Sequence, residues 1–167
     1  ANEDVQYQEI EEPEVTRGTV KIKVRYSGIC GSDIPRVLHN GVHFYPIVLG
    51  HEFSGDVVEV GEGVTKVKVG DHVSGAPLKP CMKCDDCQNG NFSLCKHYSF
   101  IGSREQGSNA DYVVIPEQNA VVYDPSIPYE QAAMFEPATV AIHGVFQNDY
   151  QGGQYVAVLG GGTIAVS

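Results

Sequence analysis

Four of the five cysteines of this chain lie within fifteen residues, and together they could bind a metal. Cys81, Cys84, Cys87 and Cys95 follow the spacing C-x2-C-x2-C-x7-C. Two residues between cysteines allow a tight turn that directs successive sulfurs at one point, and the longer gap brings in the fourth sulfur. Four thiolates at about 2.3 Å with no open coordination position form a structural zinc site. The spacing therefore predicts a zinc-binding lobe over residues 80–97.

Two other chemistries use clustered cysteines. Disulfides need an oxidising compartment, and the first residues lack the basic stretch and apolar core of a signal peptide. We therefore expect reduced thiols and a cytoplasmic protein. Some iron–sulfur proteins share the C-x2-C-x2-C opening, but their motif continues with three residues and then Cys-Pro. Here the last gap is seven residues and Lys96 follows Cys95, which disfavours a cluster.

A second possible metal site involves the fifth cysteine. Cys30 lies in Gly-Ile-Cys-Gly-Ser-Asp at residues 28–33, and His51 lies in Gly-His-Glu-Phe-Ser-Gly at residues 50–55. A lone cysteine is more often a small buried hydrophobe, and a lone histidine is more often a hydrogen-bonded core residue. Together, flanked by glycines and near a zinc lobe, the two motifs match a known family pattern.

Short strands are expected to position these motifs. The chain has 167 residues, with 42% hydrophobic residues, 19 glycines and 9 prolines. Alternating or Val-rich runs between turn residues predict a mainly β fold, with strands at 20–26, 52–60, 64–69, 71–74, 111–116 and 119–123. Residues 128–147 have a helical pattern that Pro137 interrupts, which predicts two helical segments meeting there.

The composition excludes some partners. The formal net charge is −10, and no basic stripe is present, so we expect no nucleic-acid partner. No apolar run approaches the ~20 residues of a membrane helix, so we expect no membrane partner either.

The last residues suggest the start of a nucleotide-binding unit. Residues 154–159 look like a buried strand, and the following Gly-Gly-Gly-Thr-Ile-Ala fits the phosphate-binding turn G-x-G-x-x-G/A. The acidic residue expected ~20 positions further on would lie past Ser167. We therefore expect residues 151–167 to be the truncated beginning of a Rossmann domain. The turn supplies the candidate cofactor-binding residues Gly160, Gly162, Thr163 and Ile164.

Taken together, these motifs resemble the medium-chain, zinc-dependent alcohol and polyol dehydrogenases over about residues 20–165. The motifs are those at 28–33, 50–55 and 70–73, the four-cysteine lobe and the glycine turn. The resemblance implies that residues 1–150 form a GroES-like catalytic domain. Segments 31–36, 40–46, 100–104 and 135–137 most resemble members of the family that oxidise galactitol 1-phosphate. Residues 107–112 depart from it, with Gly-Ser-Asn-Ala-Asp-Tyr in place of Gly-Gly-Phe-Ala-Glu-Tyr.

The resemblance also implies roles for single residues. Catalytic zinc ligands would be Cys30, His51 and, from the Glu-Pro motif of polyol-type members, Glu136. Glu52 would contact the metal or hold its water. Ser32 would be the first proton-relay group, and Asp33 would hydrogen-bond His51 and fix its tautomer. The candidates for substrate contacts are His43, Tyr45 and Arg104.

The expected activity is NAD-dependent oxidation of a secondary alcohol of a polyol or polyol phosphate to a ketone. The resemblance implies two zinc ions in each full subunit, and a homodimer or homotetramer. Sorbitol, L-threonine and butanediol remain alternative substrates. A non-catalytic, zinc-stabilised domain is the alternative function, and it would not need a second zinc site with an open position.

Two further expectations concern the substrate and the extent of the chain. A phosphate needs cationic partners, and the basic residues nearest the motifs are Arg36, Lys79 and Arg104. Of these, only Arg104 belongs to a segment expected at the site. These 167 residues alone should bind zinc without turnover, because hydride transfer needs a nucleotide domain that positions the nicotinamide.

Overall fold

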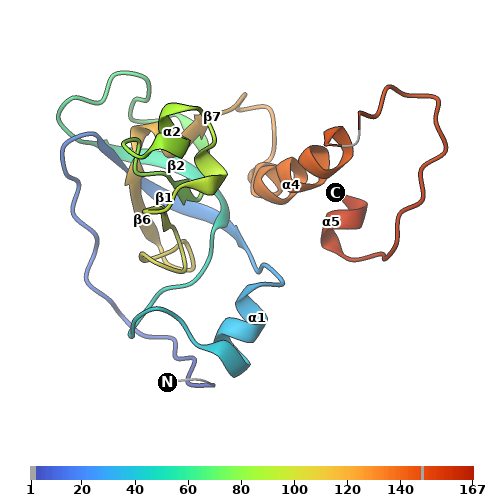
Figure 1. Ribbon diagram of the computed structural model, residues 1–167. Coiled ribbons are helices and arrows are strands. Elements are labelled where there is room, and N and C mark those ends of the chain that lie inside the picture. The colour runs from blue at the N-terminus through green and yellow to red at the C-terminus, as the bar shows by residue number, and fades with distance from the viewer. Residues whose placement is uncertain (1–2, 148) are drawn as a thin grey trace.

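A five-stranded antiparallel sheet forms the body of the protein, in the order β6-β1-β2-β3-β7 (Figure 1). The computed structural model describes residues 3–147 and 149–167. The strands are β1 (Thr19–Gly28), β2 (Glu52–Val60), β3 (His72–Gly75), β6 (Tyr112–Pro116) and β7 (Ala120–Val122). Five of the seven strands that the sequence predicted are therefore present, and the prediction of a mainly β fold is confirmed.

One apolar cluster joins the strands. Val20 and Ile22 of β1 are fully buried, as the alternation predicted, and Phe53 of β2 packs in the same cluster. The polar residue between the two β1 side chains is also covered, because Lys21 Nζ lies 2.9 Å from a carboxylate oxygen of both Glu12 and Glu59. The remaining fully or largely buried members are Val57, Val67, Val73, Ile101, Val113 and Ile115.

The elements outside this sheet are mostly short. The helical segments are α1 (Asp33–Pro35), η1 (Arg36–Asn40), α2 (Asp85–Gln88), η2 (Phe92–Leu94), η3 (Glu117–Asn119), α3 (Tyr129–Ala132), α4 (Phe135–Phe146) and α5 (Thr163–Val166). A two-stranded sheet pairs β4 (Leu78–Lys79) with β5 (Ser99–Phe100) at the base of the cysteine lobe. Within the described residues, no helix combines the length and the apolar character that a membrane crossing requires.

The strand predicted at 64–69 is not formed. Val67 is buried in the core as an alternating strand would place it, but the backbone N–H groups bond elsewhere. Those of Thr65 and Lys66 donate to the carboxylate of Glu117, and that of Lys68 donates to Asp71. Because side chains already accept these hydrogen bonds, the segment stays a loop.

The strand predicted at 154–159 is also absent. Residues 154–159 are exposed and have no regular structure, and Leu159 is fully exposed. A strand needs a neighbour for its backbone hydrogen bonds, and no described strand pairs with this segment. The glycine turn is followed by α5, which lies near α4 and away from the sheet (Figure 1).

The break between the two predicted helical segments lies before Pro137. The helix α3 ends at Ala132, and α4 starts at Phe135, so Pro137 is the third residue of α4. The first N–H groups of a helix have no partner within it, so proline is tolerated in the first turn. The proline therefore belongs to the start of α4 and does not interrupt it.

Candidate metal centres and substrate pocket

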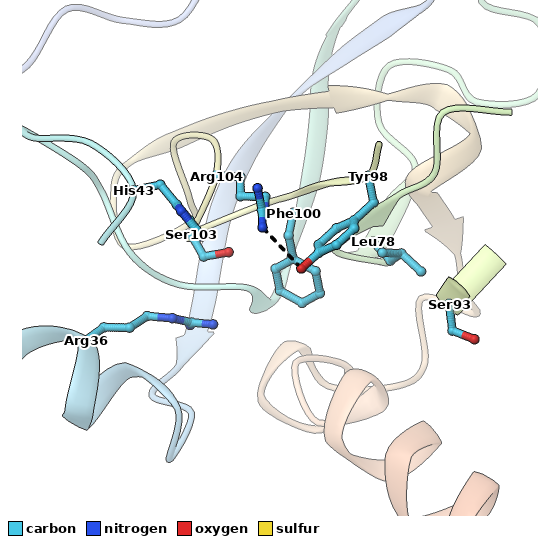
Figure 2. A pocket seen from close by; sticks show the side chains of 8 residues that line it. All are labelled: Arg36, His43, Leu78, Ser93, Tyr98, Phe100, Ser103 and Arg104. Carbon is cyan, nitrogen blue, oxygen red and sulfur yellow. Dashed lines mark hydrogen bonds between the residues drawn. The ribbon is translucent and has the colours of Figure 1, made fainter. Parts of the chain in front are cut away.

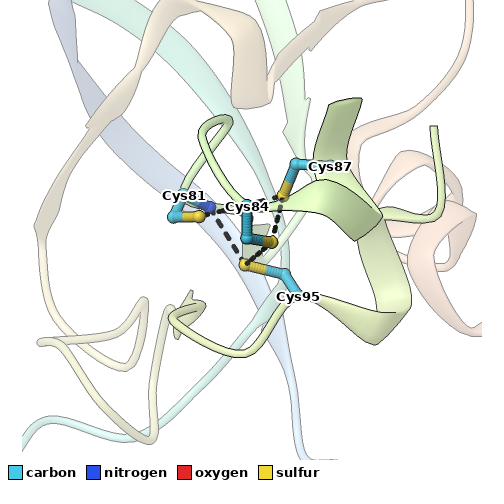
Figure 3. A group of neighbouring side chains, drawn as sticks. All are labelled: Cys81, Cys84, Cys87 and Cys95. Atoms are coloured by element: carbon cyan, nitrogen blue, oxygen red, sulfur yellow. Dashed lines mark hydrogen bonds between the residues drawn. The ribbon is translucent and has the colours of Figure 1, made fainter. Parts of the chain in front are cut away.

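The four cysteines of the lobe converge on one point (Figure 3). Cys84 Sγ lies 3.5 Å from Cys87 Sγ and 4.0 Å from Cys95 Sγ, and Cys81 Sγ lies 3.9 Å from Cys87 Sγ. Four sulfurs at about 2.3 Å from a tetrahedral zinc would lie about 3.8 Å from one another, so these positions fit that ion. All five cysteines are free thiols.

The lobe favours thiolate at one position and thiol at another. Backbone N–H groups of Lys83 and Cys84 lower the pKa of Cys81 to about 6. Burial raises the pKa of Cys87 to about 12. Zinc binds the deprotonated sulfur, so a cation at the centre has to replace the Cys87 proton. Metal binding at the lobe is thus coupled to proton release.

The second group of metal-binding side chains contains Cys30, His51 and Glu52, whose ligand atoms all lie within 4.8 Å of one another. Strand pairing brings them together, because Gly28 at the end of β1 is opposite Glu52 at the start of β2. Cys30 follows Gly28 by two residues and His51 precedes Glu52. A sulfur, an imidazole and a carboxylate are the ligand types of catalytic zinc sites, so this set fits zinc.

Two glycines provide space for this cluster. A Cβ at Gly28 would lie 2.6 Å from Glu52 Oε2, so a larger residue would displace the carboxylate. Gly50, directly before His51, has a φ of +97°, and a Cβ there would lie 2.4 Å from Asn109 Oδ1. The hydroxyl of Ser27 also donates to Asn109 Oδ1 at 2.7 Å, which connects the end of β1 to the same loop.

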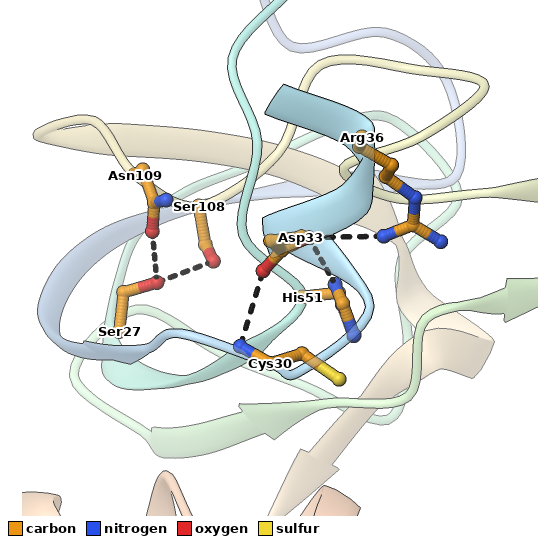
Figure 4. A network of polar contacts seen from close by, with 7 residues as sticks. All are labelled: Ser27, Cys30, Asp33, Arg36, His51, Ser108 and Asn109. Carbon is orange, nitrogen blue, oxygen red and sulfur yellow. Dashed lines mark hydrogen bonds and ion pairs between the residues drawn. The ribbon is translucent and has the colours of Figure 1, made fainter. Parts of the chain in front are cut away.

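Asp33 links the backbone of Cys30 to the ring of His51 (Figure 4). Its Oδ2 accepts the N–H of Cys30 at 3.1 Å, and its Oδ1 accepts a guanidinium N–H of Arg36 at 2.9 Å. The same Oδ1 lies 3.8 Å from His51 Nδ1, which is buried and has no hydrogen-bond partner within the described residues. Asp33 therefore faces Nδ1 at a distance too long for the hydrogen bond that the resemblance implied, and this arrangement leaves Nε2 for a metal.

His51 is held in the form that metals bind. Burial lowers the pKa of His51, and the charge of Arg36 lowers it further, while the charges of Asp33 and Glu52 act in the opposite direction. A lowered pKa keeps the imidazole neutral, and the neutral ring is the metal ligand. The ring of Phe100 packs edge-on against it, with ring centroids 5.5 Å apart.

Glu136 lies near this cluster but outside it. It is the second residue of α4, and its carboxylate is not within the 4.8 Å group that Cys30, His51 and Glu52 form. Burial raises the pKa of Glu136, and the negative charge of Glu52 raises it further. The two carboxylates therefore share one region, and the role of Glu136 as a ligand stays a prediction.

The remaining predicted residues lie at the start of α1, in or near a pocket-lining loop, and in the C-terminal segment. Ser32 is exposed at the N-cap of α1, and its side chain makes no capping hydrogen bond there. His43 and Arg104 line a pocket of about 340 Å³, whereas Tyr45 is not among its lining residues (Figure 2). The glycine-turn residues, Gly160, Gly162, Thr163 and Ile164, lie in the exposed C-terminal segment.

The sequence did not indicate several of the residues that line the pocket. Arg36, considered only as a nearby basic residue, lines the pocket, together with Leu78, Ser93, Tyr98, Phe100 and Ser103. No spacing connects these residues, because they come from η1, β4, η2 and β5 and the loops near them. The available signal was local: residues 31–36 and 100–104 belong to segments that resembled polyol-phosphate dehydrogenases.

Comparisons with known proteins show what this chain is similar to. The model of the alcohol dehydrogenase GroES-like domain matches residues 16–126. Galactitol 1-phosphate 5-dehydrogenase of Escherichia coli K12 is 43% identical over 147 residues, which cover 88% of this chain and 42% of the relative. D-arabitol-phosphate dehydrogenase of Enterococcus avium is 44% identical over 144 residues, covering 83% of this chain and 40% of that protein.

Solved structures of dehydrogenases are also similar to this chain. The crystal structure of galactitol-1-phosphate dehydrogenase from Escherichia coli has a TM-score of 0.86 and 42% identity, covering 89% of this chain and 43% of that one. A protein described as a zinc-binding dehydrogenase from Sinorhizobium meliloti 1021, bound to NADP, has a TM-score of 0.84 and 31% identity, covering 88% of this chain and 43% of that one. The chain thus spans less than half the length of these relatives.

Proposed function

Because the chain belongs to the alcohol dehydrogenase GroES-like domain family, as its resemblance predicted, we propose that the complete protein is a zinc-dependent oxidoreductase. It oxidises a secondary alcohol of a polyol or polyol phosphate to a ketone, with NAD as the hydride acceptor. The observation that carries this proposal is the Cys30, His51 and Glu52 cluster. A domain that used zinc only for stability would be served by the cysteine lobe alone.

The Cys30, His51 and Glu52 cluster would hold a zinc ion with an open coordination position, which would lower the pKa of an alcohol bound there. The residues of this chain have separate tasks around that position. Asp33 accepts the backbone N–H of Cys30 and faces Nδ1 of His51. Ser32, which is exposed two residues after Cys30, would carry the released proton toward solvent. The acidic ligand would be Glu52, whose carboxylate lies in the cluster, or Glu136, which the family resemblance implies.

The names of the relatives favour a phosphorylated polyol, because two of them are polyol-phosphate dehydrogenases. Sorbitol and L-threonine also appear in the names of relatives, at 40% and 39% identity. They remain alternative substrate types.

Metal content and activity test the proposal together. The complete protein should bind two zinc ions per chain and oxidise a polyol or polyol phosphate with NAD. Cys30→Ser should lose one zinc and all turnover while it keeps the lobe zinc and its unfolding temperature. A wild-type protein that binds a single zinc, or that oxidises no alcohol in a panel of polyols and polyol phosphates, would contradict the proposal and favour a non-catalytic domain.

A further inference from the structure

The pocket beside the metal cluster is lined by basic residues, although the chain as a whole is acidic. The chain has a formal net charge of −10, yet none of the eight residues that line the pocket is acidic. Two of them are arginines, Arg36 and Arg104, and a third is His43. Figure 2 shows both guanidinium groups directed toward the same space. An acidic protein that collects cationic side chains in one pocket is suited to an anionic ligand.

Arg104 differs from the other arginines in its lack of an acidic partner. Of the four arginines in the sequence, Arg17, Arg25 and Arg36 each lie within 4.0 Å of a carboxylate, and in the described part of the chain Arg104 does not. Its guanidinium lies 4.6 Å from the centroid of the Tyr98 ring and donates to the Tyr98 hydroxyl at 3.4 Å. The tyrosine orients this cation without neutralising it.

Arg36 is held in place from the opposite side of the pocket. Its Nη1 donates to Asp33 at 2.9 Å, and its side chain is 24% exposed. This bond fixes the guanidinium beside the metal cluster and leaves further N–H groups for a ligand. Lys79, the third basic candidate from the sequence, forms an ion pair with Glu105 and does not line the pocket. Of the three basic candidates, Arg36 and Arg104 therefore line the pocket and Lys79 does not.

Two residues, Asp33 and Phe100, connect the pocket to the metal cluster. Asp33 contacts both Arg36 and Cys30, and Phe100 lines the pocket while its ring packs against His51. One small molecule can therefore have one end at the metal cluster and the other between the arginines. Arginine forks bind phosphate oxygens through paired N–H groups, and the hydroxyl of Ser103 lies in the same pocket.

We propose that Arg36 and Arg104 bind the phosphate of a phosphorylated polyol whose alcohol lies at the Cys30, His51 and Glu52 cluster. This subsite makes the enzyme prefer the phosphate ester to the free polyol. The inference rests on the proposed function for its reaction, but the anion site is a property of the pocket itself. A dinucleotide also has phosphate groups, so the test has to separate the two sources of phosphate.

The decisive variant is Arg104→Ala in the complete, zinc-loaded protein, with Arg17→Ala as the matched control. Arg17 is equally an arginine, but its side chain is 78% exposed and it precedes the opposite end of β1. The measurement is kcat/KM for a polyol phosphate divided by kcat/KM for the same polyol without phosphate. Arg104→Ala should lower this ratio by about 10- to 100-fold, and Arg17→Ala should leave it unchanged. Arg104→Lys should be intermediate, because it keeps the charge and loses the fork.

Inorganic phosphate gives a readout that does not need turnover. Calorimetric titration should show that it binds the wild-type protein and Arg17→Ala alike, and Arg104→Ala at least about 10-fold more weakly. An unchanged ratio in Arg104→Ala would overturn the subsite. So would a wild-type preference for the free polyol, or a rise in the KM for NAD with no change in the ratio, which would assign the arginine to the dinucleotide. If no alcohol is oxidised but phosphate binding depends on Arg104, the proposed function fails and the anion site stands.

Discussion

The two groups of metal-binding side chains differ in how the chain assembles them. The four lobe cysteines come from one stretch of fifteen residues, and their sulfurs converge through local turns. Cys30, His51 and Glu52 come from two segments 21 residues apart, which the pairing of β1 with β2 brings together. Sequence spacing is therefore enough to indicate the lobe, whereas the second cluster depends on the register of the sheet.

The two groups also differ in what surrounds them. The lobe offers only sulfur ligands. Four of them complete the tetrahedral coordination of a zinc ion and leave no position for a substrate. The second cluster offers three different ligand types, a supporting carboxylate in Asp33 and an adjoining pocket. A closed set serves stability and an open set serves chemistry, so changes to each should have separable effects.

The largest effect is expected from opening the lobe. Cys95→Ser removes one of four ligands, and the lobe has little regular structure besides α2 and η2. The variant should lose much of the ~10 kcal/mol that a structural zinc contributes to folding. Thermal unfolding and metal analysis measure this, with Ser93→Ala as a control that leaves all ligands in place. A variant that kept the wild-type unfolding temperature without lobe zinc would remove the distinction between the two groups.

A smaller effect on folding, with a large effect on metal content, is expected at Glu136. Glu136→Ala should reduce zinc at the second cluster and leave the lobe zinc bound, because the two ligand sets share no residue. Chelator titration of the wild type should likewise remove the second zinc first, since its coordination is open. Glu52→Ala is the informative comparison. Full zinc occupancy and turnover in Glu136→Ala, with loss of both in Glu52→Ala, would assign the acidic ligand to Glu52 alone.

Gly28→Ala tests whether strand packing sets the second cluster. The added Cβ would lie 2.6 Å from Glu52 Oε2, so the carboxylate must move. We expect zinc affinity at this cluster to fall on the order of 10-fold, which is the lower range for disturbing the surroundings of a ligand. Gly31→Ala is the matched control, because a Cβ there meets no atom within 4 Å. Equal zinc affinities in the two variants, measured by competition with a chelator, would show that the contact is unimportant.

The smallest effect is expected at Tyr129, which attaches α3 to the sheet. Its hydroxyl donates to Asp56 at 2.5 Å and lies 3.0 Å from His72 Nε2, and its carbonyl accepts the Ser54 hydroxyl at 2.6 Å. Tyr129→Phe should cost about 1–2 kcal/mol of unfolding free energy, measured by urea denaturation. The fully exposed Tyr7 supplies the control, Tyr7→Phe. Because α3 leads into α4, zinc at the second cluster should be affected and lobe zinc should not.

The same network predicts an acid dependence of stability. Burial acts to raise the pKa of Asp56, but hydrogen bonds from Tyr129 and Arg25 outweigh it and lower the pKa below the ordinary value of 3.8. A lowered pKa gives stability that is present above 3.8 and is lost as the pH falls below it. Asp56→Asn should therefore flatten the unfolding free energy in that acid range. A wild-type slope equal to that of the variant would contradict this.

Predictions from the sequence succeeded where the determining interactions are local. The strand at 20–26 was indicated by alternation and the strand at 111–116 by a Val/Ile-rich run, and their buried residues were found in the core. The strands expected at 64–69 and 154–159 failed for a shared reason. Alternation or apolar character does not show where the backbone hydrogen bonds will go, and here Glu117 accepts those of the first segment while the second has no neighbouring strand.

The sequence by itself indicated the lobe and the candidate ligands Cys30 and His51, because cysteine spacing and glycine-flanked motifs are properties of short segments. The tertiary structure alone decided that Glu52 lies with Cys30 and His51 while Glu136 lies outside their group. It also decided that Arg36 and Arg104, 68 positions apart in the sequence, line one pocket beside them. The physical reason is that strand register and loop packing set distances between segments, and no spacing along the chain records those distances.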